Sequence, residues 1–575
     1  MSLPIDTILP QLLHALQSGA AAVLQAPPGA GKTTRVPLAL LTESWLQGRR
    51  IVMLEPRRLA ARAAARFMSA QLGEPVGQTV GYRMRLDSKV SATTRIEVVT
   101  EGVLTRLLQD DPALERYGCV IFDEFHERSL QADLGLALAL EVQQALRPDL
   151  RLLVMSATLD AEPVARLLGG APLISSEGRS YPVEVRYRPA GRQPLEQHLV
   201  EVIQQALREE SGSVLVFLPG GGEIRRLARM LTPRLPADTF LAPLYGELAQ
   251  GAQDAAIAPA PAGQRKIVLA TAIAETSLTI EGVRVVVDAG LSRRAAFDPV
   301  SGLTRLVTVK VSQAAAEQRR GRAGRLEPGI CYRLWAQAEQ PRLAAFTPPE
   351  ILEADLADLV LELAQWGALT PTALTWLDPP PAPAWEQAKA LLQQLQALTP
   401  EGRISEHGRA LRALPLHPRL AHMLIRGREL GWSRLAAELA ALLSERDVLS
   451  GGREASVEAR LAVIRGTAAG GDRNRLQRVR ASIQALQRYR GVTELPEDGA
   501  AAGILLAYAY PERIARRRSA DAPRYLLANG RGAYLEPNDP LRAAQFLVAA
   551  ELDGDPRDAR IFLAAALSRD AIERH

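Results

Sequence analysis

The 575-residue sequence predicts an α/β protein in which two tandem parallel-sheet domains are followed by helical and β-rich parts. Three observations lead to this prediction. Short apolar runs alternate with amphipathic helical windows as far as residue 174, as in a parallel sheet that helices cover on both faces. The same alternation begins again after residue 175, and leucine- and alanine-rich helices replace it beyond about residue 340. A chain of this length exceeds one hydrophobic core, so we expect about three to five domains.

The strands of both sheets are expected at apolar runs of about five residues that are bounded by turn or cap residues. In the first domain these runs are Ala21–Gln25, Arg50–Leu54, Arg95–Val99, Cys119–Asp123 and Arg151–Met155. In the second domain they are Val183–Tyr187, Ser213–Leu218, Lys266–Ala270 and Val283–Asp288. The stretch Ser175–Pro182 contains Gly and Pro, which predicts a linker between the two. The repetition indicates a duplicated architecture.

The C-terminal part is expected to begin with helices and to end with strands. Asp378–Pro383 is too rich in proline to be helical, and helices are predicted on both sides, at Glu350–Trp366, at Ala384–Leu398 and from about Gly408 to Arg490. Asn529-Gly530 is a hairpin signal between the apolar runs Tyr525–Ala528 and Ala533–Leu535. Further strands are predicted at Phe546–Asp553 and Arg560–Ala566.

Composition excludes several classes of protein. The chain has two cysteines, Cys119 and Cys331, which excludes a disulfide framework and a cysteine-based zinc site. Met1–Pro10 lacks the basic start of a signal peptide and no stretch is as long as a membrane span, so we expect a cytoplasmic protein without membrane contact. The net charge of +5, with a pI near 9.3 and Arg far above Lys, slightly favours nucleic acid as a partner.

A glycine-rich loop, Ala26–Thr33, follows the first predicted strand and precedes a helical window. In this context backbone N–H groups and the helix dipole hold phosphates, Lys32 neutralises the β- and γ-phosphates, and the Thr33 hydroxyl ligates Mg²⁺. Ala26 stands where the first glycine of such loops is usual, and a chance glycine-rich turn is the alternative interpretation. The strand–loop–helix context favours nucleotide binding by Pro28, Gly29, Ala30, Gly31, Lys32, Thr33 and Thr34.

An acidic pair, Asp123-Glu124, ends a buried apolar run. The carboxyl end of a parallel strand faces the phosphate loop of its sheet, so both carboxylates are candidate metal ligands together with Thr33. Glu124 is also expected to orient and deprotonate the attacking water. Taken alone the pair would fit an acidic helix cap better, but its pairing with Lys32 in one α/β domain favours catalysis.

Two neighbouring elements extend this prediction. His126 has no partners at metal-ligand spacing, so we expect it to couple the site to the other domain by a hydrogen bond across the cleft. Ser156-Ala157-Thr158 follows the run Arg151–Met155, and its small hydroxylated residues are candidates for linking the acidic site to the neighbouring domain. Ser156 is assigned to nucleotide binding on this basis.

The arginine-rich stretch Gln318–Arg325 lies at the end of the second α/β unit. Arginines three residues apart share one face of a helix, so Arg322 and Arg325 are expected to point at one anion and to stabilise γ-phosphate charge. A solvated basic run or a localisation signal is the alternative, which the position in the chain disfavours.

Five motifs occur in a characteristic order. They are Lys32-Thr33, DEFH at Asp123–His126, SAT at Ser156–Thr158, ATAIAETSLTI at Ala270–Ile280 and QRRGRAGR at Gln318–Arg325. Together they resemble the DEAH-box helicases of superfamily 2. EPRRLAARAAAR at Glu55–Arg66 and TEGVLTR at Thr100–Arg106 are most similar to the bacterial HrpB-type ATP-dependent helicases. The resemblance extends over about residues 4–420 and is looser beyond.

The resemblance implies a domain order. Two RecA-like domains are expected at residues 1–174 and 175–338, a winged helix at 339–402, a helical ratchet bundle at 403–510 and a β-rich or OB-like region at 511–575. Because relatives continue past the position of His575, the last region is expected to be truncated. An NTP would bind between the RecA-like domains, with Lys32 on one side and Gln318, Arg322 and Arg325 on the other.

The resemblance also implies how the base and the nucleic acid are held. The base would lie between Arg66 and a ring of the second domain, but Leu291 occupies the ring position, so GTP and other NTPs should be hydrolysed alongside ATP. Sequence-independent contacts to the nucleic-acid backbone are expected from Arg58, Arg85, Thr100 and Thr271. Ala272 stands where relatives usually have Asn, which would weaken one such contact.

Two further features concern the nucleic acid. Arg293–Asp298 and Leu303–Lys310 flank Pro299–Gly302 and predict a hairpin, which related helicases use to separate strands. Basic clusters at Asp472–Arg480 and Arg516–Arg518 fit an exit channel and a solvated surface equally well.

The expected function is that of a monomeric, Mg²⁺-dependent RNA helicase. RNA, single-stranded or structured, would stimulate ATP hydrolysis, which would drive 3′-to-5′ translocation and unwinding or remodelling. A helicase that acts on DNA or on both nucleic acids is the first alternative, because sequence does not show 2′-hydroxyl contacts. A catalytically silent scaffold is the second, which the intact Lys32, Asp123, Glu124, Gln318, Arg322 and Arg325 disfavour.

Overall fold

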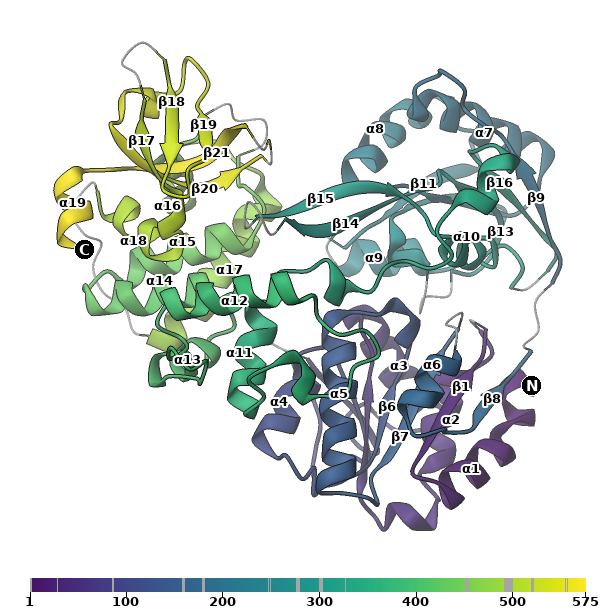
Figure 1. The fold of residues 1–575 in the computed structure, drawn as a ribbon. Helices are drawn as coiled ribbons and strands as arrows, with labels where there is room; N and C mark the ends of the chain where they lie inside the picture. Colours follow the sequence, from purple (N-terminus) through teal and green to yellow (C-terminus); the bar gives the residue numbers. More distant parts are fainter. Residues whose placement is uncertain are drawn as a thin grey trace. The chain divides into compact units, whose positions relative to one another are not determined.

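The computed structural model, drawn as a ribbon in Figure 1, describes most of the chain. The chain consists of two compact units. The described residues are 3–27, 29–84, 87–157, 161–177, 181–246, 248, 250–275, 280–298, 303–325, 327–449, 454–490, 500–518, 522–553, 555 and 557–575. The first unit consists of Met1–Ala296, Leu306–Ala354 and Leu374–Pro379. The second consists of Phe297–Arg305, Asp355–Ala373 and Pro380–His575.

The first domain of unit 1 is built on an eight-stranded sheet in the order β4-β3-β5-β2-β6-β7-β1-β8. Its strands are β1 Ala21–Gln25, β2 Arg50–Leu54, β3 Val80–Met84, β4 Asp87–Lys89, β5 Ile96–Val99, β6 Tyr117–Phe122, β7 Arg151–Ser156 and β8 Leu173–Ser175. The strand pairs are parallel except for β3 with β4. The five predicted runs are confirmed as β1, β2, β5, β6 and β7, with small shifts at their ends.

The remaining three strands of this sheet were not predicted. β4 and β8 have three residues each, too few to give an apolar pattern. β3 contains Gly81, where a Cβ atom would collide with the carbonyl oxygen of Lys89 on the neighbouring strand. Glycine here permits the close approach of two backbones, which hydrophobic periodicity does not reveal.

The described part of this domain has six α-helices, of which five follow a strand, as expected for parallel crossovers, and α1 precedes β1. They are α1 Leu9–Ser18, α2 Lys32–Leu40, α3 Arg58–Gln71, α4 Val103–Asp110, α5 Leu130–Ala145 and α6 Ala161–Leu167. α5 is apolar around most of its circumference, and Ser129 caps it by accepting a hydrogen bond from the Ala132 N–H at 3.2 Å. All six residues of β6 are buried, so the sheet is covered on both faces as predicted.

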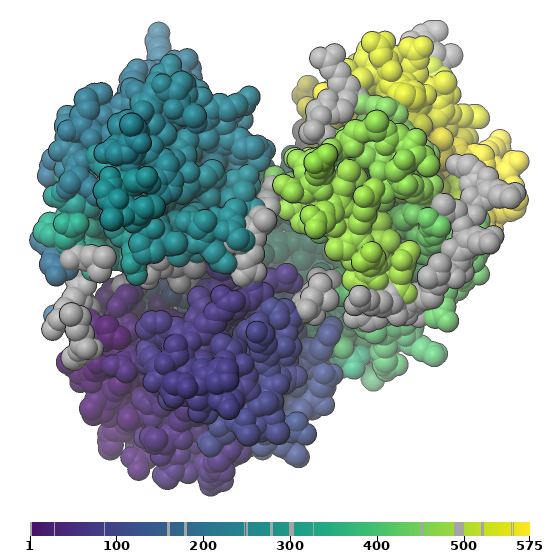
Figure 2. All heavy atoms as spheres, turned by 180° about the vertical axis from the view of Figure 1, so that it is seen from behind, coloured from purple at the N-terminus to yellow at the C-terminus, as the bar shows by residue number. Residues whose placement is uncertain are grey.

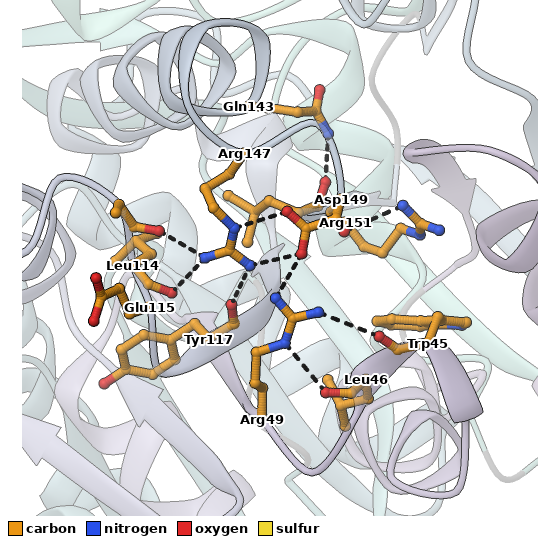
Figure 3. Close-up of polar contacts among 12 residues, drawn as sticks. Trp45, Leu46, Arg49, Leu114, Glu115, Tyr117, Gln143, Arg147, Asp149 and Arg151 are labelled. Atoms are coloured by element: carbon orange, nitrogen blue, oxygen red, sulfur yellow. Dashed lines mark hydrogen bonds and ion pairs between the residues drawn. The ribbon is translucent and has the colours of Figure 1, made fainter.

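The amino end of this sheet holds a compact cluster of arginines around one carboxylate (Figure 3). Asp149 lies two residues before the start of β7. Its carboxylate accepts hydrogen bonds from Arg49 Nη1 at 2.5 Å and from Arg147 Nε at 2.8 Å. Arg147 Nη1 also donates to the Leu114 carbonyl at 3.0 Å, and Arg49 Nε donates to the Leu46 carbonyl at 3.4 Å. We call Arg49, Arg147 and Asp149 the amino-end cluster.

The second domain of unit 1 is built on a six-stranded parallel sheet in the order β11-β12-β10-β13-β16-β9. Its strands are β9 Val183–Tyr187, β10 Ser213–Phe217, β11 Thr239–Leu244, β12 Arg265–Ala270, β13 Val283–Asp288 and β16 Gly329–Arg333. Its helices are α7 Leu195–Glu209, α8 Gly221–Leu231, α9 Gln250–Ile257 and α10 Gln313–Arg320. The four predicted strands are confirmed, whereas β16 and β11, an edge strand that contains Pro243, were not predicted.

The predicted hairpin is present as a separate two-stranded sheet. Its strands are β14 Leu291–Asp298 and β15 Leu303–Lys310, so β14 starts two residues earlier than expected. The predicted turn, Pro299–Gly302, lies outside the described residues.

Most of unit 2 consists of helices and a small barrel. The helices are α11 Ala357–Trp366, α12 Ala382–Gln394, α13 Glu406–Arg412, α14 Pro418–Glu429, α15 Ser433–Ser444, α16 Val457–Arg465, α17 Arg473–Arg490, α18 Ala501–Ala509 and α19 Arg569–Arg574. Strands β17 Ile514–Arg517, β18 Arg524–Leu527, β19 Gly532–Tyr534, β20 Phe546–Leu552 and β21 Asp558–Leu567 close a barrel in the order β17-β18-β19-β21-β20. In Figure 2 the lime-green and yellow atoms of the later helices and the barrel lie against one another.

Two helix predictions for this part need correction. α12 begins at Ala382 and includes Pro383, because a proline in the first turn has no N–H that the helix would use. The helix expected over Glu350–Trp366 is a 3₁₀ turn, Glu350–Leu352, followed by α11, and Glu353 to Leu356 separate them. The hairpin around Asn529-Gly530 and the strands at β20 and β21 are confirmed.

The basic cluster predicted at Asp472–Arg480 makes structural contacts along α17. Arg475 Nη1 donates to the Asp447 carbonyl at 2.7 Å, and Arg480 Nη2 donates to the Ile464 carbonyl at 3.0 Å. Of the second cluster, Arg516 and Arg518 are exposed. Among the described residues, no helix has both the length and the apolar character needed to cross a membrane.

Candidate functional site

The glycine-rich loop connects β1 to α2 at the carboxyl end of the first sheet. Gly29 and Gly31 have φ angles of 85° and 97°, which other residues rarely adopt. A Cβ at Gly31 would also lie 2.7 Å from Leu3 Cδ1. Lys32 begins α2, so the first N–H groups of this helix face the loop and are available to an anion.

The other predicted residues of the loop lie as expected, with one exception. Ala26, at the position of the usual glycine, is fully buried, and its N–H donates to the Ser156 carbonyl at 2.9 Å. Ala30 is buried, and Thr33 and Thr34 lie in the first turn of α2. Pro28 lies outside the described residues.

Lys32, Thr33, Asp123 and Glu124 meet at one place. Lys32 Nζ donates to Glu124 Oε1 at 2.8 Å and lies 3.8 Å from Asp123 Oδ1. The Thr33 hydroxyl donates to Asp123 Oδ2 at 2.5 Å. The structure therefore brings together the residues that the sequence assigned to phosphate, metal and water.

The pKa values of the two carboxylates of this site are shifted in opposite directions. Burial disfavours the charged form of Glu124, but the Lys32 ammonium outweighs it and lowers the pKa of Glu124 to about 2. Burial raises the pKa of Asp123 to about 6, against the opposing effect of Lys32. The pKa of Lys32 is raised, because its two carboxylate neighbours outweigh its burial. Both carboxylates are therefore mostly ionised at neutral pH, and Glu124 stays ionised to a lower pH than Asp123 does.

The backbone at Glu124 is unusual, since its φ angle of 50° lies in the left-handed region. Such a conformation costs about 1 kcal/mol in a non-glycine residue and occurs most often at functional sites. Glu124 Oε2 is buried and accepts no hydrogen bond from the residues that the structure describes. A buried carboxylate oxygen that faces a phosphate loop is available to a water molecule or to a ligand.

His126 lies 3.4 Å from this oxygen through its Nε2 atom. Its Nδ1 accepts the Ala157 N–H at 3.2 Å, so Nδ1 carries no proton and Nε2 carries it in the neutral ring. Burial lowers the pKa of His126, which keeps the ring neutral. The described hydrogen bond of His126 therefore joins the acidic site to the Ser156-Ala157 segment of its own domain, not to the second domain as expected.

Arg322 and Arg325 reach this site electrostatically from the second domain. Burial lowers the pKa of Arg322 well below its usual value and that of Arg325 to about 10, and the negative charge of Glu124 acts against both shifts. The charge of Arg322 in turn contributes to the lowered pKa of Glu124. Both arginines therefore lie within electrostatic range of Glu124.

The prediction that both arginines lie on one helix face is wrong. α10 ends at Arg320, and residues 321–325 form turns. A Cβ at Gly324 would lie 2.6 Å from the Tyr181 carbonyl oxygen, so the chain packs against its neighbours here instead of continuing as a helix. Gln318 lies on α10 and is largely buried.

Arg319 was not predicted as part of the site. It is fully buried, donates to Asp288 Oδ1 at 2.7 Å and to Glu275 Oε1 at 2.6 Å, and lies over the Phe217 ring with its Cζ 4.9 Å from the centroid. From the sequence, only Arg322 and Arg325 of this stretch were assigned to phosphate, and Arg319 received no role. Arg319 instead fixes α10 to β13 and to the segment Thr271–Glu275, whose last carbonyl accepts a hydrogen bond from Arg322.

Glu55 was also not predicted as part of the site. It directly follows β2, is fully buried, and lies close enough to Asp123 and Glu124 to be affected by their charge. Burial and these two carboxylates raise the pKa of Glu55 well above its usual value. The position at a strand end was the available signal, since carboxyl ends of parallel strands share one edge.

The residues predicted to hold the base and the nucleic acid do not belong to this buried cluster. Arg66 and Arg58 are exposed on α3, and Leu291 begins β14, where its carbonyl accepts Arg319 Nη1 at 3.2 Å. Thr100 is buried after β5, and Thr271 is partly buried after β12. Arg85 lies outside the described residues.

The donor set fits a nucleoside triphosphate with one divalent ion. The described residues contain no cluster of three or more His, Cys, Asp or Glu side chains that would hold a metal by itself. Thr33 and Asp123 lie side by side, and oxygen ligands of this kind suit Mg²⁺, which takes its remaining ligands from phosphates and water. Lys32 supplies the charge that phosphate requires.

Comparison with known proteins identifies the family. The DEAD/DEAH box helicase family matches residues 7–167, and the helicase conserved C-terminal domain matches residues 196–327. The ATP-dependent RNA helicase HrpB of Escherichia coli (strain K12) is 48% identical over 575 residues, which are 99% of this chain and 69% of that protein. The chain belongs to the DEAH-box helicases of HrpB type. It is therefore an ATP-hydrolysing enzyme of a family that uses a divalent metal.

Other relatives support the same fold. Two solved structures, of the E. coli DExH-box NTPase HrpB and of the E. coli DEAH/RHA helicase HrpB, have TM-scores of 0.85 and 0.86 at 48% and 47% identity. They cover 100% and 99% of this chain, which spans 69% and 71% of theirs. The pre-mRNA-splicing factor ATP-dependent RNA helicase prp22 of Schizosaccharomyces pombe is 37% identical over 470 residues, 80% of this chain but 40% of that protein.

Proposed function

We propose that this HrpB-type helicase binds ATP and Mg²⁺ at the carboxyl ends of its two sheets and uses hydrolysis to move 3′ to 5′ along single-stranded RNA. One arrangement carries the proposal. Lys32, Asp123 and Glu124 are buried together, and the charges of Arg322 and Arg325 reach Glu124 from the second domain. RNA is proposed because the two relatives HrpB and prp22 are both named ATP-dependent RNA helicases.

Phosphate binding falls to the first domain. The N–H groups at the start of α2 and the Lys32 ammonium would hold the β- and γ-phosphates, and Gly29 and Gly31 let the backbone approach them. Thr33 and Asp123 would hold Mg²⁺, which lowers the charge on the phosphates when bound. Lys32 now neutralises Glu124, and a move of its ammonium towards phosphate would leave that carboxylate free for water.

Glu124 is proposed to orient the attacking water and to accept its proton at Oε2. The pKa of about 2 keeps this carboxylate ionised, and the left-handed backbone aims it into the site. The Nε2 atom of His126, which carries the proton of the neutral ring, lies 3.4 Å from the same oxygen. Its neutral ring adds no competing charge at neutral pH.

The second domain is proposed to complete the site on closure. Arg322 and Arg325 would stabilise the charge that develops on the γ-phosphate, and Gln318 would contact the triphosphate. Burial of both guanidinium groups next to a carboxylate makes their interaction with an anion stronger than in water. Opening after hydrolysis would let one domain shift along the RNA.

RNA contacts are proposed at Arg58, Arg85, Thr100 and Thr271, which would hold the phosphate backbone without reading sequence. The hairpin of β14 and β15 is proposed to separate strands. We further propose the domain limits 1–174, 175–338, 339–402, 403–510 and 511–575, with RecA-like, RecA-like, winged-helix, ratchet and OB-like roles in that order. The protein is proposed to act as a cytoplasmic monomer.

An ATPase assay with single-stranded RNA and DNA of equal length tests this function. RNA should raise kcat more than DNA does, and the association constant for RNA should fall with salt, with a log–log slope of about −0.7 per neutralised phosphate. A duplex with a 3′ overhang should be unwound, and one with a 5′ overhang should not. Equal stimulation by DNA would favour a helicase of both nucleic acids, and absence of stimulation by either would refute the proposal.

A further inference from the structure

Arg57 joins the two sheet domains of unit 1 at a point that the proposed mechanism does not use. Its Nη1 donates to the main-chain carbonyl of Ala272 in the second domain at 3.0 Å. Its other two nitrogens face Glu127 in the first domain, with Nε 3.3 Å from Oε2 and Nη2 3.1 Å from Oε1. One guanidinium group therefore binds a carboxylate of one domain and a carbonyl of the other.

Both partners of Arg57 are continuous with the catalytic groups. Glu127 directly follows His126 in the acidic motif Asp123–His126. On the other side, the Ala272 carbonyl also accepts the Glu275 N–H at 3.0 Å, and the Glu275 carbonyl accepts a hydrogen bond from Arg322. The described contacts thus run without a gap from the acidic motif through Arg57 to Arg322.

The second half of this path is held rigid. Ala272–Ala274 form a short 3₁₀ helix, and the Ala274 N–H donates to the Thr271 carbonyl at 3.2 Å. The Glu275 carboxylate binds the buried Arg319, which also binds Asp288 at the end of β13. A displacement of the Ala272 carbonyl would therefore move Glu275, and with it the acceptor of Arg322.

The chemistry of position 57 suits an arginine. Three nitrogens of one planar group meet a carboxylate and a carbonyl together, which a single ammonium would not do. Arg57 is largely enclosed, with 24% of its side chain exposed, and its pKa is raised because Glu127 and Glu275 outweigh its burial. Its charge is therefore retained at this position.

Position 272 explains why the contact goes to the main chain. Alanine offers no side-chain acceptor, whereas a carbonyl oxygen is present whatever residue stands there. Arg57 can thus hold this segment although the side chain expected there from the family resemblance is absent.

We infer that Arg57 is a positioning residue for hydrolysis, which on closure of the two domains holds the segment Thr271–Glu275 through the Ala272 carbonyl and thereby sets the position of Arg322. The inference rests on the proposed function, because it assigns Arg322 to the γ-phosphate. It makes no claim that Arg57 touches the nucleotide.

The first experiment compares the variants Arg57→Ala and Arg57→Lys of the 575-residue chain with Arg49→Ala. Arg49 is a matched control, because it also binds one carboxylate and a main-chain carbonyl, but within the first domain (Figure 3). Loss of one charged hydrogen bond should lower the RNA-stimulated kcat of Arg57→Ala about ten-fold, with a smaller fall for Arg57→Lys. Arg49→Ala should keep kcat within two-fold, while its melting temperature falls as much as that of Arg57→Ala or more.

The second experiment asks whether Arg57 acts through Arg322. The effects of groups that act as a unit are not additive, so Arg57→Ala should cost almost nothing in an Arg322→Ala background. Equal kcat values of Arg322→Ala and the double variant, within two-fold, are expected. A full further ten-fold loss in the double variant would overturn the inference, and so would an Arg57→Ala enzyme whose kcat is unchanged.

The two proposals fail in different ways. If Arg322→Ala leaves hydrolysis intact, the proposed function of the second-domain arginines is wrong, and the inference about Arg57 is withdrawn with it. If Arg322→Ala lowers kcat strongly but Arg57→Ala does not, the proposed function stands and the positioning role is wrong.

Discussion

The amino end and the carboxyl end of the first sheet use the same residue types for different purposes. At the amino end, one carboxylate, Asp149, faces Arg49 and Arg147, which also donate to main-chain carbonyls. At the carboxyl end, Asp123 and Glu124 share one Lys32, and the carboxylate of Glu55 lies near both. Half of the Asp149 side chain is exposed (49%), whereas those of Asp123 and Glu124 are 0% and 4% exposed.

The difference separates a structural cluster from a functional one. Exposed, fully paired groups stabilise a fold modestly and need no further partner. A group of buried carboxylates, one of them on a residue with a left-handed backbone, is costly for the free protein. Such a cost is expected at a functional site, here where a metal cation bound together with the nucleotide would complete the set of charges.

Among the changes that test this comparison, removal of the Glu124 charge should have the largest effect on hydrolysis. We expect Glu124→Gln to lower the RNA-stimulated kcat about a thousand-fold, because the proton of the attacking water loses its acceptor. The shape of the site is kept, so nucleotide affinity, measured by fluorescence titration, should change little. Unchanged hydrolysis in this variant would mean that the acidic pair is structural, like its counterpart at the amino end.

The pH dependence of the Mg²⁺ requirement should distinguish the carboxyl end of the sheet from the amino end. The pKa of Asp123 is raised to about 6, so this carboxylate is protonated below that pH and loses its capacity as a metal ligand. From pH 7 to pH 5 the ionised fraction falls about ten-fold, and the Mg²⁺ concentration for half-maximal hydrolysis should rise by the same factor. A Mg²⁺ requirement that does not vary with pH would contradict the assignment of Asp123.

The amino-end cluster should affect stability and not catalysis. Asp149→Ala removes the shared partner of Arg49 and Arg147, and for this half-exposed group we expect a loss of about 1 kcal/mol in the free energy of unfolding. Denaturant titration measures the loss, and kcat should stay within two-fold of the parent enzyme. The two arginines lower the pKa of Asp149, so this stabilisation is present at neutral pH and is lost as the pH falls below the usual aspartate range. A strong fall in kcat would show that the two ends are coupled.

The smallest expected effect concerns the base. Leu291 offers no ring, and Leu291→Phe should add stacking of about 1 kcal/mol. We expect the KM for ATP to fall a few-fold, with little change in kcat. An enzyme that already prefers ATP strongly over GTP, and that does not respond to this change, would argue that Arg66 and Leu291 do not hold the base.

Much of this site could be predicted from the sequence, because its residues follow strands that are buried on both faces. The ends of β1 and β6 placed Lys32 and Asp123 at one edge, and the structure brings their side chains within 3.8 Å. Contacts that depend on three-dimensional packing could not be predicted. Arg57 and Arg319 stand in arginine-rich stretches and received no role from the sequence, yet they bind carboxylates and a carbonyl. The end of α10 at Arg320 was missed for the same reason, since the packing at Gly324 is not visible in the local pattern.

A structure of the protein with ADP, aluminium fluoride and Mg²⁺ would test the central claim most directly. The account predicts that the guanidinium nitrogens of Arg322 and Arg325 lie about 3 Å from the fluoride that replaces the γ-phosphate, while Lys32 contacts the same group from the opposite side. Guanidinium groups that point away from a nucleotide bound at Lys32 would contradict it.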